Sequence, residues 1–340
     1  MPTHIARWDL DKTYLRTDFD TLRELVKTAL ERPDEKRTNP GASTLLREML
    51  RAGVSVHILS GSPEQMRRRL EDKLRLDGIT WDSFTLKPNL QNVLRLRFRA
   101  VKDQLGYKLP ALLRARARSA EGENAESAVL KETLFGDDAE ADAFVYSLYG
   151  DVCSGRVSEE LLIGVCEKGK VYEDILEDIV QNVHRIQSRD TVERILIHLE
   201  RQTPPDDFRV YGARAVPFYN YLQAAFVVFE DGRLPAEAVL RVAVELIVQH
   251  RFDGDALARS YLDLARRGHL RGERVLDLDE SLATWTDREK VPGATELRRM
   301  CDRLPAHAEI ARKNAPSGDA PVPDYKKLVK LHNARRSKRR

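Results

Sequence analysis

The sequence predicts an α/β domain followed by a mostly helical region, and three observations support that prediction. Short apolar runs typical of strands end in polar residues at 9–13, 60–63 and 136–142. A segment with helical spacing separates the first two runs, and after residue 151 apolar residues recur mostly at helical spacing. Strands that alternate with helices are typical of α/β domains, whereas a long helical stretch indicates a second unit.

The first predicted strand covers residues 4–8 and ends in the sequence DLDKT, which includes Asp9, Asp11 and Thr13. Side chains alternate along a strand, so Asp9 and Asp11 point the same way at its end. Such a pair can hold a hard divalent cation such as Mg²⁺ while one carboxylate attacks phosphorus. Taken alone, the pattern Asp-x-Asp-x-Thr is a weak signal, because acidic pairs in turns are common.

The next two elements predict a second part of a phosphate site. Residues 40–53 have the spacing of a helix, with Ser43 near its start and Gly53 at its end. Residues 54–59 then predict a short buried strand that leads into Ser60. A serine at this position can donate its hydroxyl to a phosphate oxygen, helped by the backbone N–H groups of a following helix. The alternative is an ordinary turn or helix-capping serine.

The third predicted strand, residues 132–135, runs into Gly136, Asp137, Asp138 and further acids. Glycine allows a sharp turn at the end of a strand. The acids that follow could complete a cation site. The alternative is a solvated helix start, where acidic residues are favourable because of the helix dipole.

In this order, the motifs resemble the haloacid dehalogenase superfamily of phosphatases. More narrowly, residues 57–63 and 135–146 resemble the phosphatidate-phosphatase-like domain of the lipins and actin-patch phosphatases. The resemblance covers roughly residues 5–152, and it implies a Rossmann-like parallel sheet with little or no cap domain. Two features depart from it. Lys12 stands where that subfamily often has another acid, and the strand before Asp9 is less apolar than a central strand usually is.

The resemblance implies a role for each motif residue. Asp9 would be the nucleophile that forms an aspartyl-phosphate. Asp11 would protonate the leaving oxygen and later activate water. Thr13, Ser60 and Gly61 would position the phosphate and the strand ends.

The resemblance also implies a Mg²⁺ site and a catalytic lysine. The metal would be held by the carboxylate of Asp9, the backbone carbonyl of Asp11, and Asp137, with either Asp138 or Asp142 supporting it by orienting metal-bound water. A lysine should lie close to both nucleophile and phosphate to offset negative charge in the transition state. Lys108, at the start of a predicted helix before the third strand, is the preferred residue, and Lys87, which precedes a proline, is its rival.

Composition indicates a folded chain that is expected in the cytoplasm. Its 340 residues leave room for two domains, and 42% are hydrophobic while 33% are charged. No apolar stretch reaches the roughly 18 residues of a membrane span, and the N-terminus lacks a basic-then-apolar signal sequence. The three cysteines are scattered, which indicates neither a disulfide framework nor a zinc site.

Three divisions are expected: residues 1–152, residues 153–312 and residues 313–340. The second is predicted to be all-helical, with residues 192–199 continuing its helical pattern, and to serve as a scaffold or as a surface for a protein partner. The third is predicted to be a linker and a basic tail. That tail is either solvated and disordered, or an electrostatic contact for nucleic acid or an anionic membrane.

These expectations lead to a magnesium-dependent phosphomonoesterase. Inserts at 14–40, with a short helix near 22–30, and at 64–107 are too short for a cap domain, which needs on the order of a hundred residues. An open site favours a bulky or exposed phosphate on a lipid, a protein or a nucleic-acid end. The competing hypothesis is a non-catalytic binding module whose acidic pocket retains a cation and whose helical region is the functional surface.

Overall fold

The computed structural model describes residues 4–16, 37–87, 104–120, 129–315 and 321–337. Within them, six strands form one parallel sheet in the order β3-β2-β1-β4-β5-β6. The strands are β1 (His4–Trp8), β2 (Ser55–Pro63), β3 (Ser83–Lys87), β4 (Lys131–Asp137), β5 (Val192–His198) and β6 (Ala215–Phe218). This is the strand order of a Rossmann-like doubly wound fold, as the sequence predicted.

The first three predicted strands and the helix between them are confirmed. The helices of this part are α2 (Ala42–Arg51), α3 (Arg67–Leu76), α6 (Lys108–Ala120) and α7 (Asp142–Cys153). Strand β1 is central and every residue in it is buried, although it contains His4 and Arg7. Arg7 is accommodated because its guanidinium forms two hydrogen bonds, of 2.7 and 3.0 Å, with the buried carboxylate of Glu132 on β4. The second strand runs further than predicted, because β2 continues through Ser60 to Pro63 before the 3₁₀ turn η1 (Glu64–Met66) begins.

The prediction of an all-helical second region is wrong for two segments, because β5 and β6 lie in it. In β5, Ile195, Leu196 and Ile197 are all fully buried. A parallel strand covered on both faces has a continuous apolar run without alternation, and such a run resembles a helix in sequence. The sheet therefore crosses the boundary expected at residue 152.

The remaining elements after β6 are helical, as the helical spacing of apolar residues in this region predicted. The helices after α7 are α8 (Glu159–Lys168), α9 (Glu173–His184), α10 (Tyr221–Glu230), α11 (Ala236–His250), α12 (Gly254–Arg266), α13 (Val275–Arg288), α14 (Ala294–Asn314) and α15 (Tyr325–Ser337), with the 3₁₀ segment η2 (Pro205–Tyr211) between β5 and β6.

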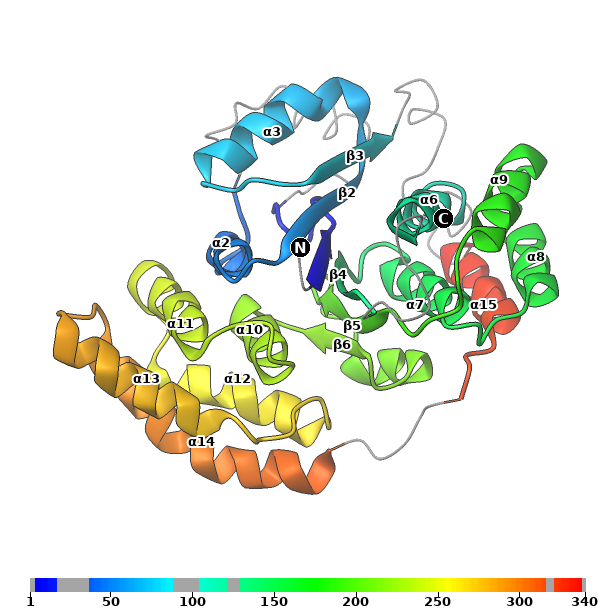
Figure 1. Ribbon diagram of the computed structural model, residues 1–340. Coiled ribbons are helices and arrows are strands. Elements are labelled where there is room, and N and C mark those ends of the chain that lie inside the picture. The colour runs from blue at the N-terminus through cyan, green and yellow to red at the C-terminus, as the bar shows by residue number, and fades with distance from the viewer. Residues whose placement is uncertain (1–3, 17–36, 88–103, 121–128, 316–320, 338–340) are drawn as a thin grey trace.

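Two apolar cores cover the two faces of the sheet (Figure 1). One core joins Trp8, Phe135 and Leu196 of the sheet to α2, α3 and the helices α10 to α14. The other joins Leu134 and Ile195 to α6, α7, α8, α9 and α15. Among the described residues, helices α10 to α14 therefore share a core with the sheet.

The expected disordered tail is wrong for residues 325–337, which form α15. Tyr325 is fully buried and donates a hydrogen bond of 2.5 Å from its hydroxyl to Asp151 of α7. Leu328 and Val329 are buried beside it, so the helix has an apolar face despite its many lysines.

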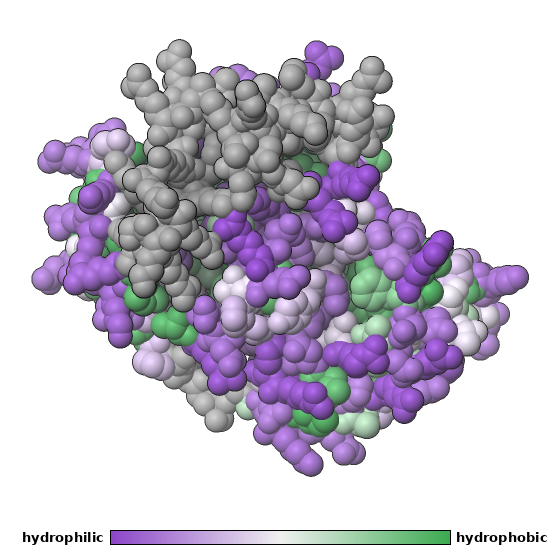
Figure 2. All heavy atoms as spheres, turned by 180° about the vertical axis from the view of Figure 1, so that it is seen from behind, coloured by the Kyte–Doolittle hydropathy of each residue, from purple (hydrophilic) through white to green (hydrophobic). Residues whose placement is uncertain are grey.

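Some expectations fall outside the described residues. These are the helix near 22–30, much of both short inserts and part of the linker, residues 316–320. None of the helices in the described part combines the length and apolar character needed to cross a membrane. On the face that Figure 2 shows, hydrophilic side chains cover most of the described surface and apolar ones occur in small groups.

Candidate functional site

The predicted motif residues lie at the carboxyl ends of β1 and β4. Asp9 follows β1 directly, Asp137 is the last residue of β4, and the Asp9 backbone N–H donates to the Phe135 carbonyl at 3.0 Å. The chain progresses outward from β1 to β2 and β3 on one side, and β4 begins the other side. Doubly wound sheets bind their ligands at such a switch point, outside the carboxyl ends of the strands.

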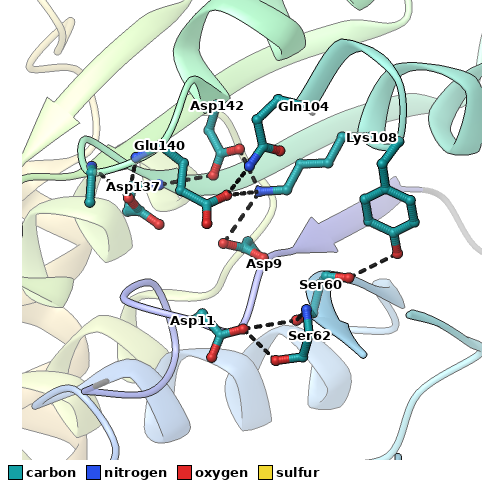
Figure 3. Close-up of polar contacts among 11 residues, drawn as sticks. Asp9, Asp11, Ser60, Ser62, Gln104, Lys108, Asp137, Glu140 and Asp142 are labelled. Carbon is teal, nitrogen blue, oxygen red and sulfur yellow. Dashed lines mark hydrogen bonds and ion pairs between the residues drawn. The ribbon is translucent and has the colours of Figure 1, made fainter. Parts of the chain in front are cut away.

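Three buried aspartates converge at this point (Figure 3). Asp9, Asp137 and Asp142 each offer a carboxylate oxygen, and these three oxygens lie within 4.8 Å of one another. Asp9 is separated from the other two by more than 120 residues of sequence, so the sheet brings the early and late acids together. The convergence that the sequence predicted is therefore present in the structure.

Asp142 reaches the cluster because residue 136 is a glycine. A Cβ atom at Gly136 would lie 2.5 Å from Oδ2 and 2.6 Å from Cβ of Asp142, a spacing that no other side chain allows. Asp142 lies in the first turn of α7 and its Oδ2 accepts a hydrogen bond from the backbone N–H of Asp137 at 3.2 Å. Asp137 is held in turn, since its Oδ1 accepts from the backbone N–H groups of Ala139 and Glu140 at 2.6 and 3.0 Å.

Lys108 is the cation of the cluster. Its ammonium group is fully buried and lies 2.5 Å from Asp142, 3.2 Å from Glu140 and 3.5 Å from Asp9. Gln104, one turn earlier, donates a hydrogen bond to the same Glu140 carboxylate. The ammonium of the rival lysine, Lys87, lies over the Tyr107 ring, 5.8 Å from its centre.

Among the described residues, the cluster brings together more buried carboxyl groups than positive charges. Burial raises the pKa of Asp9 well above its usual value; Lys108 opposes this, and the nearby carboxylates reinforce it. Burial and the neighbouring Asp142 do the same to the pKa of Asp137, and burial raises the pKa of Asp142 to about 6. Burial opposes the charge on Lys108, but the carboxylates of Asp142 and Asp9 outweigh it and raise the lysine pKa. One lysine thus faces several acids, and an added positive charge would relieve their repulsion.

The residues present fit a hard divalent cation. Both carboxylate oxygens of Asp9 and Oδ2 of Asp137 are buried and accept no hydrogen bond from the described residues, and the Lys108 ammonium forms only an ion pair of 3.5 Å with Asp9. A buried acceptor without a partner is costly, and most such atoms in proteins are satisfied. Oxygen donors of this kind are the ligands that Mg²⁺ prefers.

Asp11 lies on the other side of Asp9, among serines from the end of β2 (Figure 3). Its Oδ2 accepts hydrogen bonds from the hydroxyls of Ser62 and Ser60, at 2.6 and 3.2 Å. The Ser60 hydroxyl also accepts from the Ser62 backbone N–H at 3.0 Å, and Tyr107 donates to the Ser60 carbonyl at 2.8 Å. Ser60 is therefore at the site, and in this structure it contacts Asp11.

The backbone between Asp11 and Thr13 is held by residues from the rest of the chain. Lys12 has a φ of 61°, in the left-handed region that is costly for a residue with a side chain. Its carbonyl accepts from Nδ1 of His198 at 3.0 Å and from the Asn39 amide at 3.4 Å. The Thr13 carbonyl accepts from Asn39 at 2.6 Å and from the Tyr221 hydroxyl at 2.5 Å. We call these three donors, His198, Asn39 and Tyr221, the backbone clamp.

Burial lowers the pKa of the His198 imidazole, while its bond to the Lys12 carbonyl acts in the opposite direction. A carbonyl can only accept, so Nδ1 must carry the proton of a neutral ring. All three clamp residues donate to main-chain carbonyls of the turn. The clamp holds the turn through hydrogen bonds in a buried setting.

Asp138, one of the two acids expected to support the metal, does not join the acid cluster. Its two carboxylate oxygens accept backbone N–H bonds from Arg201 and Thr203, at 2.8 and 2.9 Å, which secures the loop after β5. Asp142, the alternative, occupies the place expected for that acid. The spacing alone could not decide between them, because the turn after β4 sets which acid points inward.

The other two predicted positions are also at the site. Thr13 is fully buried, and its hydroxyl has no hydrogen-bond partner among the described residues. Gly61 lies in β2 between Ser60 and Ser62, and nothing lies within 4 Å of where its Cβ would be.

Sequence reasoning missed several residues that shape the site. Ser62 could have been found, because Ser60 and Ser62 are two apart on a strand and therefore point the same way. Glu140 lay in the noted acidic run without a role. Nothing in the sequence indicated the clamp residues, which act through distant backbone contacts. No protein-family model and no curated protein matches the chain.

Proposed function

We propose that the chain is a magnesium-dependent phosphomonoesterase that works through an aspartyl-phosphate on Asp9. The observation that carries the proposal is the convergence of Asp9, Asp137 and Asp142 within 4.8 Å, beside a buried lysine at the switch point of a parallel sheet. Buried acids with a lysine at such an edge are the parts that phosphoryl transfer needs: a nucleophile, cation ligands and a fixed positive charge.

In the proposed reaction, an Asp9 oxygen attacks phosphorus and the ester bond breaks. The leaving oxygen takes a proton from Asp11, whose carboxyl group is oriented by Ser60 and Ser62. Asp11 then accepts a proton from a water that attacks the aspartyl-phosphate, which releases phosphate and restores Asp9. Lys108 offsets the negative charge that gathers beside Asp9.

Asp9, Asp137 and Asp142 would hold Mg²⁺ through their carboxylate oxygens, where it would neutralise phosphate charge and orient the phosphoryl group. The oxygens of Asp9 and Asp137 that accept no hydrogen bond from the described residues support this assignment. The resemblance to phosphatidate-phosphatase-like domains supports a bulky substrate, with the phosphate on a lipid, a protein or a nucleic-acid end.

The test is turnover of p-nitrophenyl phosphate with and without Mg²⁺, in the wild type and in Asp9→Asn. We expect magnesium-dependent turnover in the wild type and a loss of at least about a thousandfold in the variant, because an amide cannot act as the nucleophile. Asp190→Asn is the matched control, since that carboxylate is 68% exposed and pairs with Lys131, at the opposite end of β4 from Asp137. Thermal melts establish that each variant is folded. Turnover retained by Asp9→Asn would refute the assignment.

One observation favours the competing hypothesis of a cation-binding module without turnover. Asp9 is only 1% exposed, which restricts the approach of a phosphate. The two hypotheses differ in the same assay. A wild-type chain that binds Mg²⁺ by calorimetry, but turns over neither p-nitrophenyl phosphate nor any member of a phospho-compound panel, is a binding module.

A further inference from the structure

Two helices from distant parts of the chain bring three lysines together on the surface. The Lys326 side chain of α15 lies against Gly164 of α8: a Cβ there would be 2.6 Å from both Cε and Nζ of the lysine. Lys168 and Lys330 lie one turn further along α8 and α15, on the same faces. We call Lys168, Lys326 and Lys330 the lysine surface.

This arrangement places like charges side by side. Desolvation lowers the pKa of Lys168, and the ammonium groups of Lys330 and Lys326 lower it further, while Asp324 opposes them. Helix α15 is nevertheless fixed here by buried contacts, including the Tyr325 hydroxyl on Asp151. Positive charge gathered on a rigid surface is a ready site for an anion with several negative groups.

Only one end of the lysine surface is directed toward the acid cluster: Lys330 lies two residues before His332, whereas Lys326 adjoins Tyr325 at the far end of α7. Helix α15 runs antiparallel to α7, since Tyr325 contacts Asp151 while the His332 ring lies 5.6 Å from that of Phe144, two residues after Asp142. The end of α8 is close as well, because a Cβ at Gly169 would lie 2.6 Å from Leu105. Leu105 adjoins Gln104, which hydrogen-bonds Glu140 of the acid cluster. Figure 1 shows α15 beside α7 and α8.

An aromatic side chain accompanies the lysines. Tyr172 is 59% exposed and follows Lys168 by four residues, with the exposed Lys170 between them. Proteins that bind single-stranded nucleic acid without sequence preference combine a basic track with aromatic rings on which bases stack. A membrane surface would use the same charges and can also accommodate an interfacial tyrosine, so anionic vesicles are compared with the oligonucleotide in the test.

We propose that the lysine surface and Tyr172 bind the backbone and bases of single-stranded nucleic acid, and that the candidate site acts on its terminal phosphate. The second clause rests on the proposed function, whereas the first stands without it. The nucleic-acid end is thereby selected from the three substrate classes considered above.

The first test measures binding by the full-length chain. A fluorescein-labelled single strand of about 12 nucleotides, without a terminal phosphate, is titrated at several salt concentrations while its anisotropy is recorded. In the triple variant Lys168→Gln, Lys326→Gln and Lys330→Gln, we expect Kd to rise about tenfold or more at low salt. The slope of log affinity against log salt should fall by about 2, since each lost phosphate contact on a single strand removes about 0.7.

Matched variants separate position from net charge. Arg288→Gln, Lys290→Gln and Lys313→Gln remove the same charge from exposed sites outside this surface and should leave Kd unchanged. Tyr172→Ala should weaken binding about tenfold without changing the salt slope, because stacking is not ionic. Equal weakening by both triple variants would overturn the proposal. So would wild-type binding to phosphatidylserine vesicles but not to the oligonucleotide.

The second test links the lysine surface to the candidate site. With a terminally phosphorylated strand as substrate, the lysine variant should show a KM raised about tenfold, with p-nitrophenyl phosphate turnover unchanged. If the wild type binds the strand but turns over neither compound, the proposed function fails and the binding clause stands. If it turns over p-nitrophenyl phosphate but never the phosphorylated strand, the nucleic-acid substrate is refuted and the phosphatase remains.

Discussion

The acid cluster gathers around Asp9 and the backbone clamp holds the carbonyls of Lys12 and Thr13 in the turn that follows, and the two are built in different ways. The cluster consists of side chains, and three of its buried oxygens accept no hydrogen bond from the described residues. The clamp acts on main-chain carbonyls, and the carbonyls of Lys12 and Thr13 each have two donors. An arrangement with unsatisfied acceptors suits a ligand, whereas a satisfied one suits the support of a strained backbone.

The comparison shows that both halves of the chain contribute residues to one site. The cluster comes from the first 142 residues, while two of the three clamp residues, His198 and Tyr221, come from β5 and α10. The second half was expected to be a separate scaffold or partner domain. Its contacts with Lys12 and Thr13 make it part of the support for Asp9 and Asp11.

The largest expected effect comes from disturbing the cluster at Gly136. In Gly136→Ala the new methyl group would lie 2.5 to 2.8 Å from three atoms of Asp142, all buried. We expect a loss of up to about 3 kcal/mol in unfolding free energy, as for other overpacked cores, and a weaker response to Mg²⁺. Urea unfolding with and without Mg²⁺ measures both.

Gly61→Ala is the matched control for stability, because nothing lies within 4 Å of its added methyl group. Its unfolding free energy should stay within about 0.5 kcal/mol of the wild type. If Gly136→Ala is as stable and as responsive to Mg²⁺ as the control, Asp142 does not depend on the close approach seen here.

The sequence predicted the cluster well because its information is local. Asp9 follows a short apolar strand directly, and Gly136 precedes a run of acids, so two strand ends marked by polar residues indicated both groups. The expectation that Asp9 and Asp11 point the same way was wrong, because β1 ends at Trp8 and Asp11 lies in the turn beyond it. The choice between Asp138 and Asp142 was not local. It depends on backbone N–H groups of Arg201 and Thr203, more than 60 residues away in sequence, which engage the first of these acids.

The clamp and the last two strands could not be predicted in the same way. Strand β5 is buried on both faces, and without polar alternation its apolar run matched a helix as well as a strand. Because this segment was predicted to be helical, the role of its last residue, His198, could not be predicted either. Helix α15 was missed because lysines and arginines dominate its sequence, while its packing depends on a few apolar residues such as Tyr325.

A second prediction concerns the pH dependence of stability and uses His4, which lies at the opposite end of β1 from the site. Burial lowers the pKa of His4 to about 4, against the pull of Glu193, and its Nε2 lies 2.8 Å from the Thr133 hydroxyl. Between its unfolded value of 6.5 and about 4, the unfolded chain binds a proton that the folded chain does not. The contribution of His4 should therefore lower the unfolding free energy as the pH falls through this window, by about 2 kcal/mol at pH 4.5.

Urea unfolding from pH 7 to pH 4.5 tests this, with His4→Gln as the comparison. The variant is expected to be less stable at pH 7 but to lose less stability on acidification, because glutamine does not titrate. A variant whose curve runs parallel to the wild type would assign the acid loss to other groups.

The smallest expected effect comes from the backbone clamp, and it tests most directly whether the clamp serves the site or only the fold. Tyr221→Phe removes one hydroxyl donor from the Thr13 carbonyl, which keeps its bond from Asn39. We expect a loss of about 1 kcal/mol in stability and a several-fold fall in kcat, with KM and Mg²⁺ affinity nearly unchanged, because Asp9, Asp137 and Asp142 are not touched.

Tyr261→Phe is the matched control, since that hydroxyl donates to Glu230, away from the site. It should cost similar stability and leave kcat unchanged. If both variants behave alike, the clamp supports the fold alone; if only Tyr221→Phe lowers kcat, the strained turn at Lys12 must be held for Asp9 and Asp11 to act.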